Sequence, residues 1–574
     1  MAVFTVASLV TAANASAAGG ASGELVAKGL DSQIVAVIDK YRASLPITMA
    51  EQQVPGLAVA VVVGGRTAWL RGFGVTDGPG SQPVTPATMF SVQSISKTYT
   101  ATAVMRAVAE GKLSLDAPIT TYLPSFRVNS RFEAQPERRI TLRLLLSHRS
   151  GLTHEAPLGS NFDRTATFDE HIRSISDTWL KFPVGQRFAY SNLGIDLAGR
   201  VLEVAYERPF EDVMAQQLFT PLELRETTVD QPLIRSSANR AVGHAKGYET
   251  VPVGMAMIPA GGVYTSARDI ARFMQLHLDG GKVGERTLIS RAALDAMYEA
   301  CCNDELSTYG LGIGLSRLEV AGADVAGLGH GGGGDGFLAD MYWYPEVGLG
   351  IAVLTNSDDH RLQGRLATAM AQDILSSLPT RVGRPTNADR ARRTPVNVAE
   401  LRMRQLAGIY LEERDIEFAF EDSKLCWKVR SGCHPVEFYS PDEIGVALPS
   451  MRLECQFQKD RDRDPSAAVC RLQIGSMQLS STMPYNGSPD DQGGPDRPEW
   501  RTYLGDYEMW LWGKLSATYN VHVTGGYLYF GKYRVLDEHE PGLFFLADGE
   551  ALDLRTTRPT YRNIPLRRAV TPLP

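Results

Sequence analysis

Ser94 and Lys97 have the residue types and the spacing that suit nucleophilic catalysis. They lie within residues 90–99, where a short extended run precedes a predicted helix. Three residues span close to one helical turn, so both side chains project from the same helix face. A desolvated, neutral lysine amine can take the proton of a serine hydroxyl, and the free N–H groups at a helix start favour negative charge nearby. An exposed, solvated lysine is the ordinary alternative for this pattern.

A second candidate segment, residues 188–194, carries Tyr190 and Asn192 and no charged side chain. A tyrosine beside a lysine ammonium has a lowered pKa, and it can then take the serine proton or pass it to a leaving group. The Asn192 amide would orient Lys97 and a substrate carbonyl. A tyrosine buried in the core is the alternative interpretation of this short pattern.

Residues 327–336 are rich in glycine and include His330, Gly332 and Gly333. Such glycine density lets a substrate backbone approach an edge strand closely and exposes N–H groups to an oxyanion. A phosphate-binding loop is a rival interpretation, but the segment has no Lys-Ser or Lys-Thr ending and no helix is predicted after it. A flexible turn is the third interpretation.

The three motifs follow one another along the chain as Ser94-x-x-Lys97, Tyr190-x-Asn192 and His330-x-Gly332. Their order resembles that of the class C β-lactamase and DD-peptidase family of serine hydrolases. Residues 141–152, 259–266 and 345–356 are similar to further blocks of that family. The resemblance covers residues 32–378 and implies no metal and no cofactor.

The resemblance implies a role for each matching residue. These are Ser94 as the acylated nucleophile, Lys97 as its activating partner, Tyr190 as general base and acid, Asn192, His330 and Gly332 as substrate-positioning residues, and the backbone N–H groups of Ser94 and Gly333 as the oxyanion hole. His330 replaces the lysine of true β-lactamases, as in D-aminopeptidase-like and esterase-like relatives. A neutral imidazole holds a substrate carboxylate less well than an ammonium does, which speaks against antibiotic hydrolysis. We expect His148 to be a structural hydrogen-bonding residue rather than a member of a triad.

The helices and strands that must position these residues follow a pattern along the chain that predicts an α+β fold. Strand patterns occur at both ends of the first 380 residues, and helical patterns dominate between them. This arrangement suits one β-lactamase-like antiparallel sheet built from both chain ends, flanked by helices and carrying a helical insert. The expected elements include helices over 33–45 and 94–111, and strands over 57–63, 67–75, 309–320, 336–344 and 349–355.

The C-terminal third reads as all-β. Short runs rich in Tyr, Phe, Trp and Val follow an Arg- and Pro-rich linker, and residues 406–410 and 503–507 look like one opening strand used twice. Two barrels or one barrel of two halves would both fit, and this part resembles lipocalin-like appendages of the family. The expected domains are a signal peptide (1–22), a hydrolase domain (32–378), a linker (379–397) and β-barrel parts (398–483 and 499–574).

Composition and charge narrow the class of protein further. A length of 574 residues predicts two or three domains, and a net charge of −7 with a pI near 5.9 argues against nucleic-acid binding. Residues 2–10 are apolar and Ala15-Ser16-Ala17 offers a small-x-small cleavage site, which indicates a signal peptide and export to the periplasm or the medium. A floppy Ala-rich terminus is the alternative, because no Lys or Arg precedes the apolar run. No later stretch is long enough to span a bilayer.

Cysteine usage is compatible with export. The C-terminal third contains four cysteines, Cys426, Cys433, Cys455 and Cys470, which could form two disulfides or remain buried thiols. The other two, Cys301 and Cys302, are adjacent in the chain. No cysteine–histidine spacing resembles a zinc site.

These observations predict a serine hydrolase that forms an acyl-enzyme on amide or ester bonds. Short peptides, including peptides with D-residues, and small esters are the expected substrates. A penicillin-recognising sensor that acylates without turnover is the first alternative, and a stable adduct would reveal it. A non-catalytic scaffold is the second, and an absence of labelling by a fluorophosphonate would reveal it.

Overall fold

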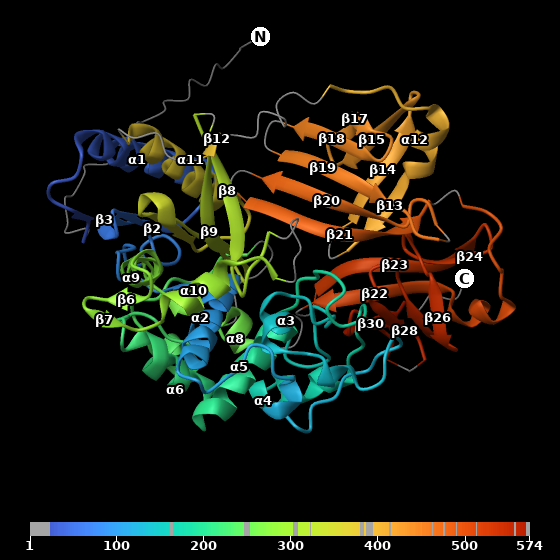
Figure 1. Ribbon diagram of the computed structural model, residues 1–574, viewed down its shortest axis with the longest axis horizontal. Helices are drawn as coiled ribbons and strands as arrows, with labels where there is room; N and C mark the ends of the chain where they lie inside the picture. The colour runs from blue at the N-terminus through green and yellow to red at the C-terminus, as the bar shows by residue number, and fades with distance from the viewer. Residues whose placement is uncertain are drawn as a thin grey trace, which may run out of the picture.

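The computed structural model describes residues 23–569 apart from 161–164, 246–252, 302–307, 322, 379–383, 386–393, 413–414, 449–450, 462, 475–476, 489–490, 512–513 and 556–557. The predicted signal peptide, residues 1–22, therefore lies outside the described residues, as do Cys302 and much of the predicted linker. Figure 1 shows a part built from helices and a sheet, beside a C-terminal part built from strands.

One antiparallel sheet forms the centre of the first part, in the order β1, β3, β2, β11, β10, β9, β12, with β8 also paired to β9. Its strands are β1 (Leu25–Val26), β2 (Gly56–Val63), β3 (Arg66–Gly74), β8 (Gly314–Val320), β9 (Ala323–Gly334), β10 (Phe337–Tyr344), β11 (Leu349–Thr355) and β12 (Arg384–Pro385). Strand β2 from the start of this part pairs with β11 from its end, with Val59 opposite Val353. This confirms the predicted sheet made from both chain ends and the α+β class.

Side chains of β2 alternate between two hydrophobic clusters, one on each face of the sheet. Leu57, Val59 and Val61 face helices α1 (Ser32–Glu51) and α11 (Leu362–Ser377). Ala58, Ala60 and Val62 face a second cluster that includes residues of α2 (Ser96–Ala109) and α9 (Ala267–Leu278). A strand with helices on both faces is apolar throughout, which explains the unbroken hydrophobic run seen in the sequence.

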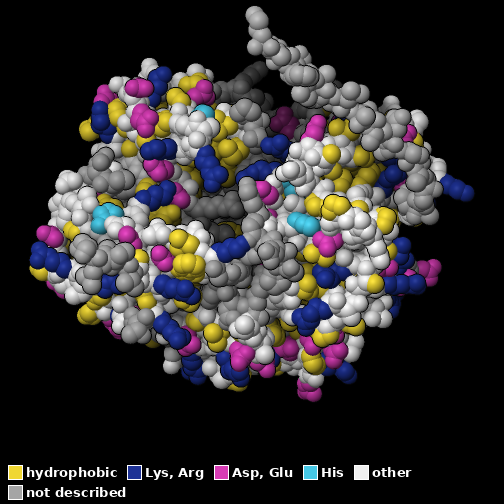
Figure 2. Space-filling model, turned by 180° about the vertical axis from the view of Figure 1, so that it is seen from behind, with side chains coloured by type: hydrophobic (Ala, Val, Ile, Leu, Met, Phe, Trp, Pro, Cys, Tyr) yellow, Lys and Arg dark blue, Asp and Glu magenta, His cyan; other side chains and the backbone are white. Residues whose placement is uncertain are grey.

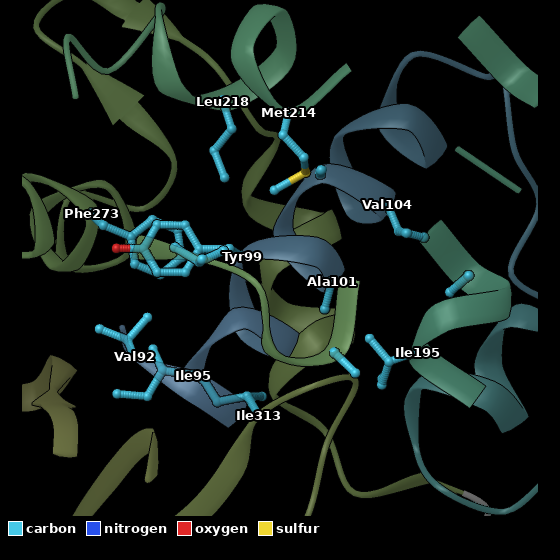
Figure 3. Packing of buried hydrophobic residues seen from close by; sticks show 14 of the residues in the cluster. Val92, Ile95, Tyr99, Ala101, Val104, Ile195, Met214, Leu218, Phe273 and Ile313 are labelled. Atoms are coloured by element: carbon cyan, nitrogen blue, oxygen red, sulfur yellow. The ribbon is translucent and has the colours of Figure 1, made fainter. Parts of the chain in front are cut away.

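Helix α2 is buried on nearly all sides, and Figure 3 shows its side chains packed among those of neighbouring elements. Tyr99 of α2 stacks on Phe273 of α9 with 3.8 Å between ring centres, and Val104 points into the same cluster. A helix fixed on several faces has little freedom to shift, so the residues at its N-terminus are held in place.

The helical insert predicted between the strands is present. Its helices are α3 (Leu142–Leu146), α4 (Phe168–Ser174), α5 (Asn192–Tyr206), α6 (Phe210–Met214), α7 (Gln231–Ser236), α8 (Ile258–Gly261) and α10 (Arg291–Tyr298), together with the short strands β4 (Phe90–Ser91), β5 (Tyr264–Thr265), β6 (Lys282–Val283) and β7 (Arg286–Thr287). Helix α1 runs beyond the predicted residue 45, because Leu45 and Met49 on either side of Pro46 both pack into the core. Of the described helices, none has the length and apolar character needed to cross a membrane.

The C-terminal part contains two nine-stranded sheets with the same strand order. The first, which we call barrel 1, follows the short helix α12 (Glu400–Leu406) and consists of β13 (Gly408–Leu411), β14 (Asp415–Glu421), β15 (Lys424–Val429), β16 (Gly432–Pro435), β17 (Glu437–Ser440), β18 (Glu443–Leu448), β19 (Met451–Gln458), β20 (Ala467–Ile474) and β21 (Met477–Gly487). The second, barrel 2, consists of β22 (Gly505–Leu511), β23 (Lys514–Thr524), β24 (Tyr527–Phe530), β25 (Tyr533–Arg534), β26 (Asp537–Glu540), β27 (Leu543–Phe545), β28 (Ala551–Asp553), β29 (Thr560–Tyr561) and β30 (Ile564–Arg568).

In each of these sheets the two end strands are consecutive in the chain, so the sheet curls toward a barrel. The repeated opening strand predicted from the sequence has a structural counterpart. Tyr410 donates a hydrogen bond to the Leu406 carbonyl at 3.0 Å, and Tyr507 donates one to the Tyr503 carbonyl at 2.9 Å. The open question of one barrel or two is thereby resolved as two barrel-like sheets.

Two disulfides strengthen barrel 1. Cys426 of β15 is joined to Cys433 of β16, and Cys455 of β19 is joined to Cys470 of β20. Both link antiparallel neighbours, which is the disulfide option that the sequence left open.

The face of the molecule seen in Figure 2 carries basic and acidic side chains interspersed with one another. The described residues on this face form no continuous basic patch, which agrees with the net charge of −7.

Candidate active site

The Ser94–Lys97 pair lies where a 3-10 turn, η1 (Gln93–Ile95), leads into α2. Lys97 Nζ donates hydrogen bonds to Ser94 Oγ at 3.1 Å and to the Ala260 carbonyl oxygen at 2.9 Å. The Lys97 side chain is fully buried. The structure thus brings together the two residues predicted as nucleophile and activating partner, although Ser94 lies in the tighter turn rather than in the α-helix itself.

The turn that presents Ser94 is strained and tightly packed. Gln93 has a left-handed backbone with φ of 48°, a conformation that costs a non-glycine residue about 1–3 kcal/mol. Strand β9 lies against this turn, and a Cβ added at Gly332 would be 2.0 Å from the Val92 carbonyl oxygen. Glycine at position 332 is therefore a steric requirement for β9 to approach Ser94.

Tyr190 faces the Lys97 amine, which lies 4.9 Å from the centre of the tyrosine ring. The following residue, Ser191, caps helix α5: its Oγ accepts from Gly194 N at 3.3 Å and donates to the Thr153 carbonyl at 2.7 Å. These bonds fix the backbone next to Tyr190, and the structure brings the Tyr190 ring together with the Lys97 amine.

Asn192 is the first residue of α5 and is buried. Its Nδ2 donates to Nε2 of His154 at 3.4 Å. The His154 ring stacks on the Tyr190 ring, with 5.9 Å between centres and an interplanar angle of 27°. Sequence reasoning missed His154, since nothing but its position just after residues 141–152 set it apart.

His330 lies on β9 with its ring centre 6.3 Å from that of Tyr190. Its Nδ1 donates to the Gly331 carbonyl at 2.5 Å, so its Nε2 accepts from the Tyr309 hydroxyl at 2.9 Å. Burial, together with the nearby Lys97, lowers the pKa of His330 to about 4. The imidazole is therefore neutral near pH 7, as the comparison with lysine anticipated.

Tyr309 is a second residue that sequence reasoning missed. It is buried, and burial raises the pKa of its phenol well above the ordinary value, with Tyr190 adding to the shift. Its ring packs against those of Phe188 and His330 at 5.8 Å between centres. The sequence placed it at the start of a strand, but β8 begins at Gly314, and Tyr309 forms only a bridge with that residue.

His148 has the structural contacts expected of it. It is buried, and its Nδ1 accepts a hydrogen bond from Ser191 N at 3.1 Å. Burial and the charge of Lys97 lower its pKa well below the ordinary value. A neutral His148 thus supports the backbone between Tyr190 and Asn192.

Gly333 follows Gly332 on β9 and pairs with Leu338 of β10. Its place beside the Ser94 turn fits the predicted oxyanion hole, which stays a prediction for the backbone N–H groups of Ser94 and Gly333.

An antiparallel sheet flanked by helices, with a serine–lysine pair at the start of a buried helix, defines the class of serine hydrolases that includes the penicillin-binding proteins. A model of the Beta-lactamase family matches residues 36–373, and the chain belongs to this family.

Known relatives show the range of proteins within that family. Penicillin-binding protein 4 of Amycolatopsis lactamdurans is 31% identical over 342 residues, which cover 57% of this chain and 86% of that protein. Esterase EstB of Burkholderia gladioli is 28% identical over 395 residues, which cover 61% of this chain and 97% of that protein. The crystal structure of SurE shares the fold, with a TM-score of 0.55 at 22% identity over 78% of this chain and 100% of that one.

Proposed function

We propose that this protein is an exported serine hydrolase that cleaves amide or ester bonds through an acyl-enzyme on Ser94. The observation that carries the proposal is the 3.1 Å hydrogen bond between Lys97 Nζ and Ser94 Oγ, formed by a fully buried lysine side chain. A surface lysine would be solvated and protonated, whereas a buried amine next to a hydroxyl is placed for proton transfer. We assign this chemistry to residues 32–378.

In the acylation step, Ser94 Oγ attacks the carbonyl carbon of the substrate. The hydroxyl proton passes to the Lys97–Tyr190 pair, and the carbonyl oxygen becomes an oxyanion held by the backbone N–H groups of Ser94 and Gly333. When the tetrahedral intermediate collapses, the C–N or C–O bond breaks and the leaving group takes the proton from Tyr190. The product of this step is an ester between Ser94 and the acyl group.

In the deacylation step, water replaces the leaving group. Tyr190 and Lys97 take one proton from the water, and the resulting hydroxide attacks the acyl carbon. The C–O bond to Ser94 then breaks, Ser94 Oγ regains a proton, and the carboxylic acid leaves. Asn192 holds the substrate carbonyl during both steps, and the edge of β9 around His330 and Gly332 binds the substrate backbone.

The substrates we propose are short peptides, including peptides with D-residues, and small esters. The neutral His330 supports this choice, because its ring nitrogens are engaged by Gly331 and Tyr309 and it supplies no positive charge for a terminal carboxylate. The relatives named as a penicillin-binding protein and an esterase are compatible with both bond types. We also propose a periplasmic or secreted location, on the basis of the apolar N-terminal segment.

The test is a rate assay of the wild type and Ser94→Ala on a D-alanyl p-nitroanilide, a short-chain p-nitrophenyl ester and a chromogenic cephalosporin. We expect turnover of the anilide or the ester that is lost in Ser94→Ala, and little turnover of the cephalosporin. Turnover that is unchanged in Ser94→Ala would overturn the proposal. A persistent adduct on Ser94 without turnover would instead establish the acylating sensor.

A further inference from the structure

The segment Thr153–Glu155 connects the candidate active site to barrel 2. It lies between α3 and α4 in the chain and is hydrogen-bonded to barrel 2. In Figure 1, strands β28 and β30 of barrel 2 lie on the side of α3 and α4 that faces the C-terminal part. Within this segment, His154 contacts both residues of the second motif: its ring stacks on Tyr190, which precedes α5, and its Nε2 accepts from Nδ2 of Asn192, the first residue of α5, at 3.4 Å. No motif of the sequence includes His154.

Glu155 determines which nitrogen of His154 carries the proton. His154 Nδ1 donates to Glu155 Oε1 at 2.9 Å, and the Glu155 side chain is only 8% exposed. With the proton on Nδ1, Nε2 carries the lone pair that accepts from the Asn192 amide. That bond fixes the amide so that its NH2 group faces His154 and its other N–H remains available for a substrate carbonyl.

Barrel 2 holds the two ends of this segment. Thr153 Oγ1 donates to Glu550 Oε2 at 2.6 Å, and Asn563 Nδ2 donates to the Glu155 carbonyl oxygen at 2.8 Å. Glu550 is itself buried and paired with Lys181 at 3.2 Å. The residues on both sides of His154 are thus attached to barrel 2, Thr153 through its hydroxyl and Glu155 through its backbone carbonyl.

Barrel 2 is closely packed against the catalytic part of the chain. A Cβ added at Gly549, in the loop between β27 and β28, would lie 1.9 Å from the Lys181 carbonyl oxygen. The Thr153 carbonyl also accepts from Ser191 Oγ at 2.7 Å, so the segment is fixed to α5 as well as to barrel 2. A shift of barrel 2 would therefore displace the residues that surround Tyr190 and Asn192.

The geometry points to His154 and Glu155 as a positioning pair that orients Asn192, held in register by Glu550 and Asn563 of barrel 2. Barrel 2 then contributes to catalysis by positioning residues of the active site. This inference rests on the proposed function, since it concerns the same acyl transfer.

The first experiment compares His154→Phe with the wild type. Phenylalanine keeps a ring on Tyr190 but accepts no hydrogen bond from Asn192. We expect kcat/KM for the preferred ester or anilide to fall about tenfold, the size of one lost hydrogen bond to a polar group. Labelling of Ser94 by a fluorophosphonate, which needs no carbonyl-positioning amide, should stay within about twofold of the wild-type rate and shows that the protein is folded.

A double-mutant cycle separates positioning from general damage. In an Asn192→Ala background, His154→Phe should have almost no further effect, because the amide that it orients is gone. His154→Gln, whose amide oxygen can accept the same hydrogen, should recover part of the lost rate. Equal effects of His154→Phe in both backgrounds would overturn the inference, as would wild-type rates in His154→Phe alone.

The second experiment tests the role of barrel 2 with Asn563→Gly and Thr153→Val. Asn563 has a left-handed φ of 63°, so glycine removes its side chain without adding backbone strain. Each variant should lower kcat/KM about threefold to tenfold, again with Ser94 labelling preserved. The matched control is Asp537→Ala, which breaks the Arg131–Asp537 ion pair between the same two parts at a distance in sequence from the Thr153–Glu155 segment.

The control variant should keep wild-type kinetics. If Asp537→Ala lowers kcat/KM as much as Asn563→Gly does, barrel attachment in general and not this segment is responsible, and the inference fails. Failure of the proposed function is distinguishable, because the wild type itself would then show no Ser94-dependent turnover and the comparison with His154→Phe would have no starting rate.

Discussion

The Lys97 amine lies between Ser94 and Tyr190, with Nζ 3.1 Å from the serine Oγ and 4.9 Å from the centre of the tyrosine ring. The Ala260 carbonyl holds the amine from a third direction at 2.9 Å. The fully buried Lys97 side chain is thus held between the residue that we propose as nucleophile and the one that we propose as general base and acid. We therefore predict the effects of changing the phenol of Tyr190 and of changing strand β9, which lies against the Ser94 turn.

Tyr190→Phe removes only the phenolic oxygen and keeps the ring that packs against Lys97 and His154. We expect kcat to fall about 10²- to 10⁴-fold, the usual range for loss of a general acid–base group. The free energy of unfolding should change little, since the ring remains. Steady-state kinetics with a p-nitrophenyl ester and urea denaturation measure the two quantities, and Tyr122→Phe, distant in sequence from both motifs, is the control. A kcat near that of the wild type would remove Tyr190 from the proton pathway.

Gly332→Ala should separate β9 from the Ser94 turn. The new Cβ would lie 2.0 Å from the Val92 carbonyl oxygen and 3.2 Å from Gln93 Cβ, and neither atom is the end of a flexible side chain that could move aside. We expect a loss of about 1–3 kcal/mol in the free energy of unfolding, the cost of overpacking, and a fall in activity larger than that loss of stability explains. Gly78→Ala is the control, because a Cβ there meets no atom within 4 Å. An active and stable Gly332→Ala protein would show that the strand can move away without consequence.

Acid should destabilise the protein through His330, because burial lowers its pKa in the folded state to about 4 whereas an unfolded histidine has a pKa of about 6.5. Between those values the unfolded chain binds a proton that the folded protein does not, so the free energy of unfolding falls as the pH decreases. We expect His330 to account for about 2 kcal/mol of the loss between pH 7 and pH 5. Burial shifts the pKa values of His148 and His277 in the same direction, so they add to this loss.

Urea unfolding of His330→Gln at pH 7 and at pH 5 measures that contribution. The variant should lose less stability between the two pH values than the wild type, by about 2 kcal/mol. His539→Gln is the control, because the exposed His539 reaches water in the folded protein. An unchanged pH dependence in His330→Gln would mean that its imidazole is protonated equally in the folded and unfolded chain.

The sequence was sufficient to predict those features that depend on residues near one another in the chain. Ser94 and Lys97 meet because they are only three residues apart, at the 3-10 turn that leads into α2, and the apolar run of β2 predicts a buried strand. The repeated opening strands of the barrels were also visible, because their Tyr410 and Tyr507 occupy the same place in each repeat.

Contacts between residues that are far apart in the chain could not be predicted from the sequence. Tyr309 reaches His330 from the end of a segment with no motif, and His154 reaches Asn192 across 38 residues. Lys181 meets Glu412 across 231 residues. Such pairs follow from the packing of whole elements, and a single sequence gives no local pattern that indicates them.

The buried ion cluster around Lys181 gives the last prediction. Its Nζ lies 2.6 Å from Glu412 of the barrel 1 side and 3.2 Å from Glu550 of barrel 2, and all three side chains are at most 6% exposed. Burial alone would lower the Lys181 pKa, but the two carboxylates outweigh it and raise the pKa. Lys181→Met removes the cation and leaves Glu550 as a buried charge. We expect a loss of about 3–5 kcal/mol in the free energy of unfolding, because breaking one side of a buried ion pair leaves an uncompensated charge.

Urea denaturation at pH 7 measures this loss, and Lys40→Met provides the matched comparison. Lys40 pairs with Asp373 at 2.6 Å, the same distance as Lys181 with Glu412, but its side chain is 60% exposed. An exposed pair is worth at most about 1 kcal/mol, so the two lysine-to-methionine variants should differ by several-fold in their effect. Because Glu550 also accepts from Thr153, the Lys181→Met protein should lose activity before it unfolds globally. Equal, small effects of the two substitutions would show that the buried cluster does not hold the barrels to the catalytic part.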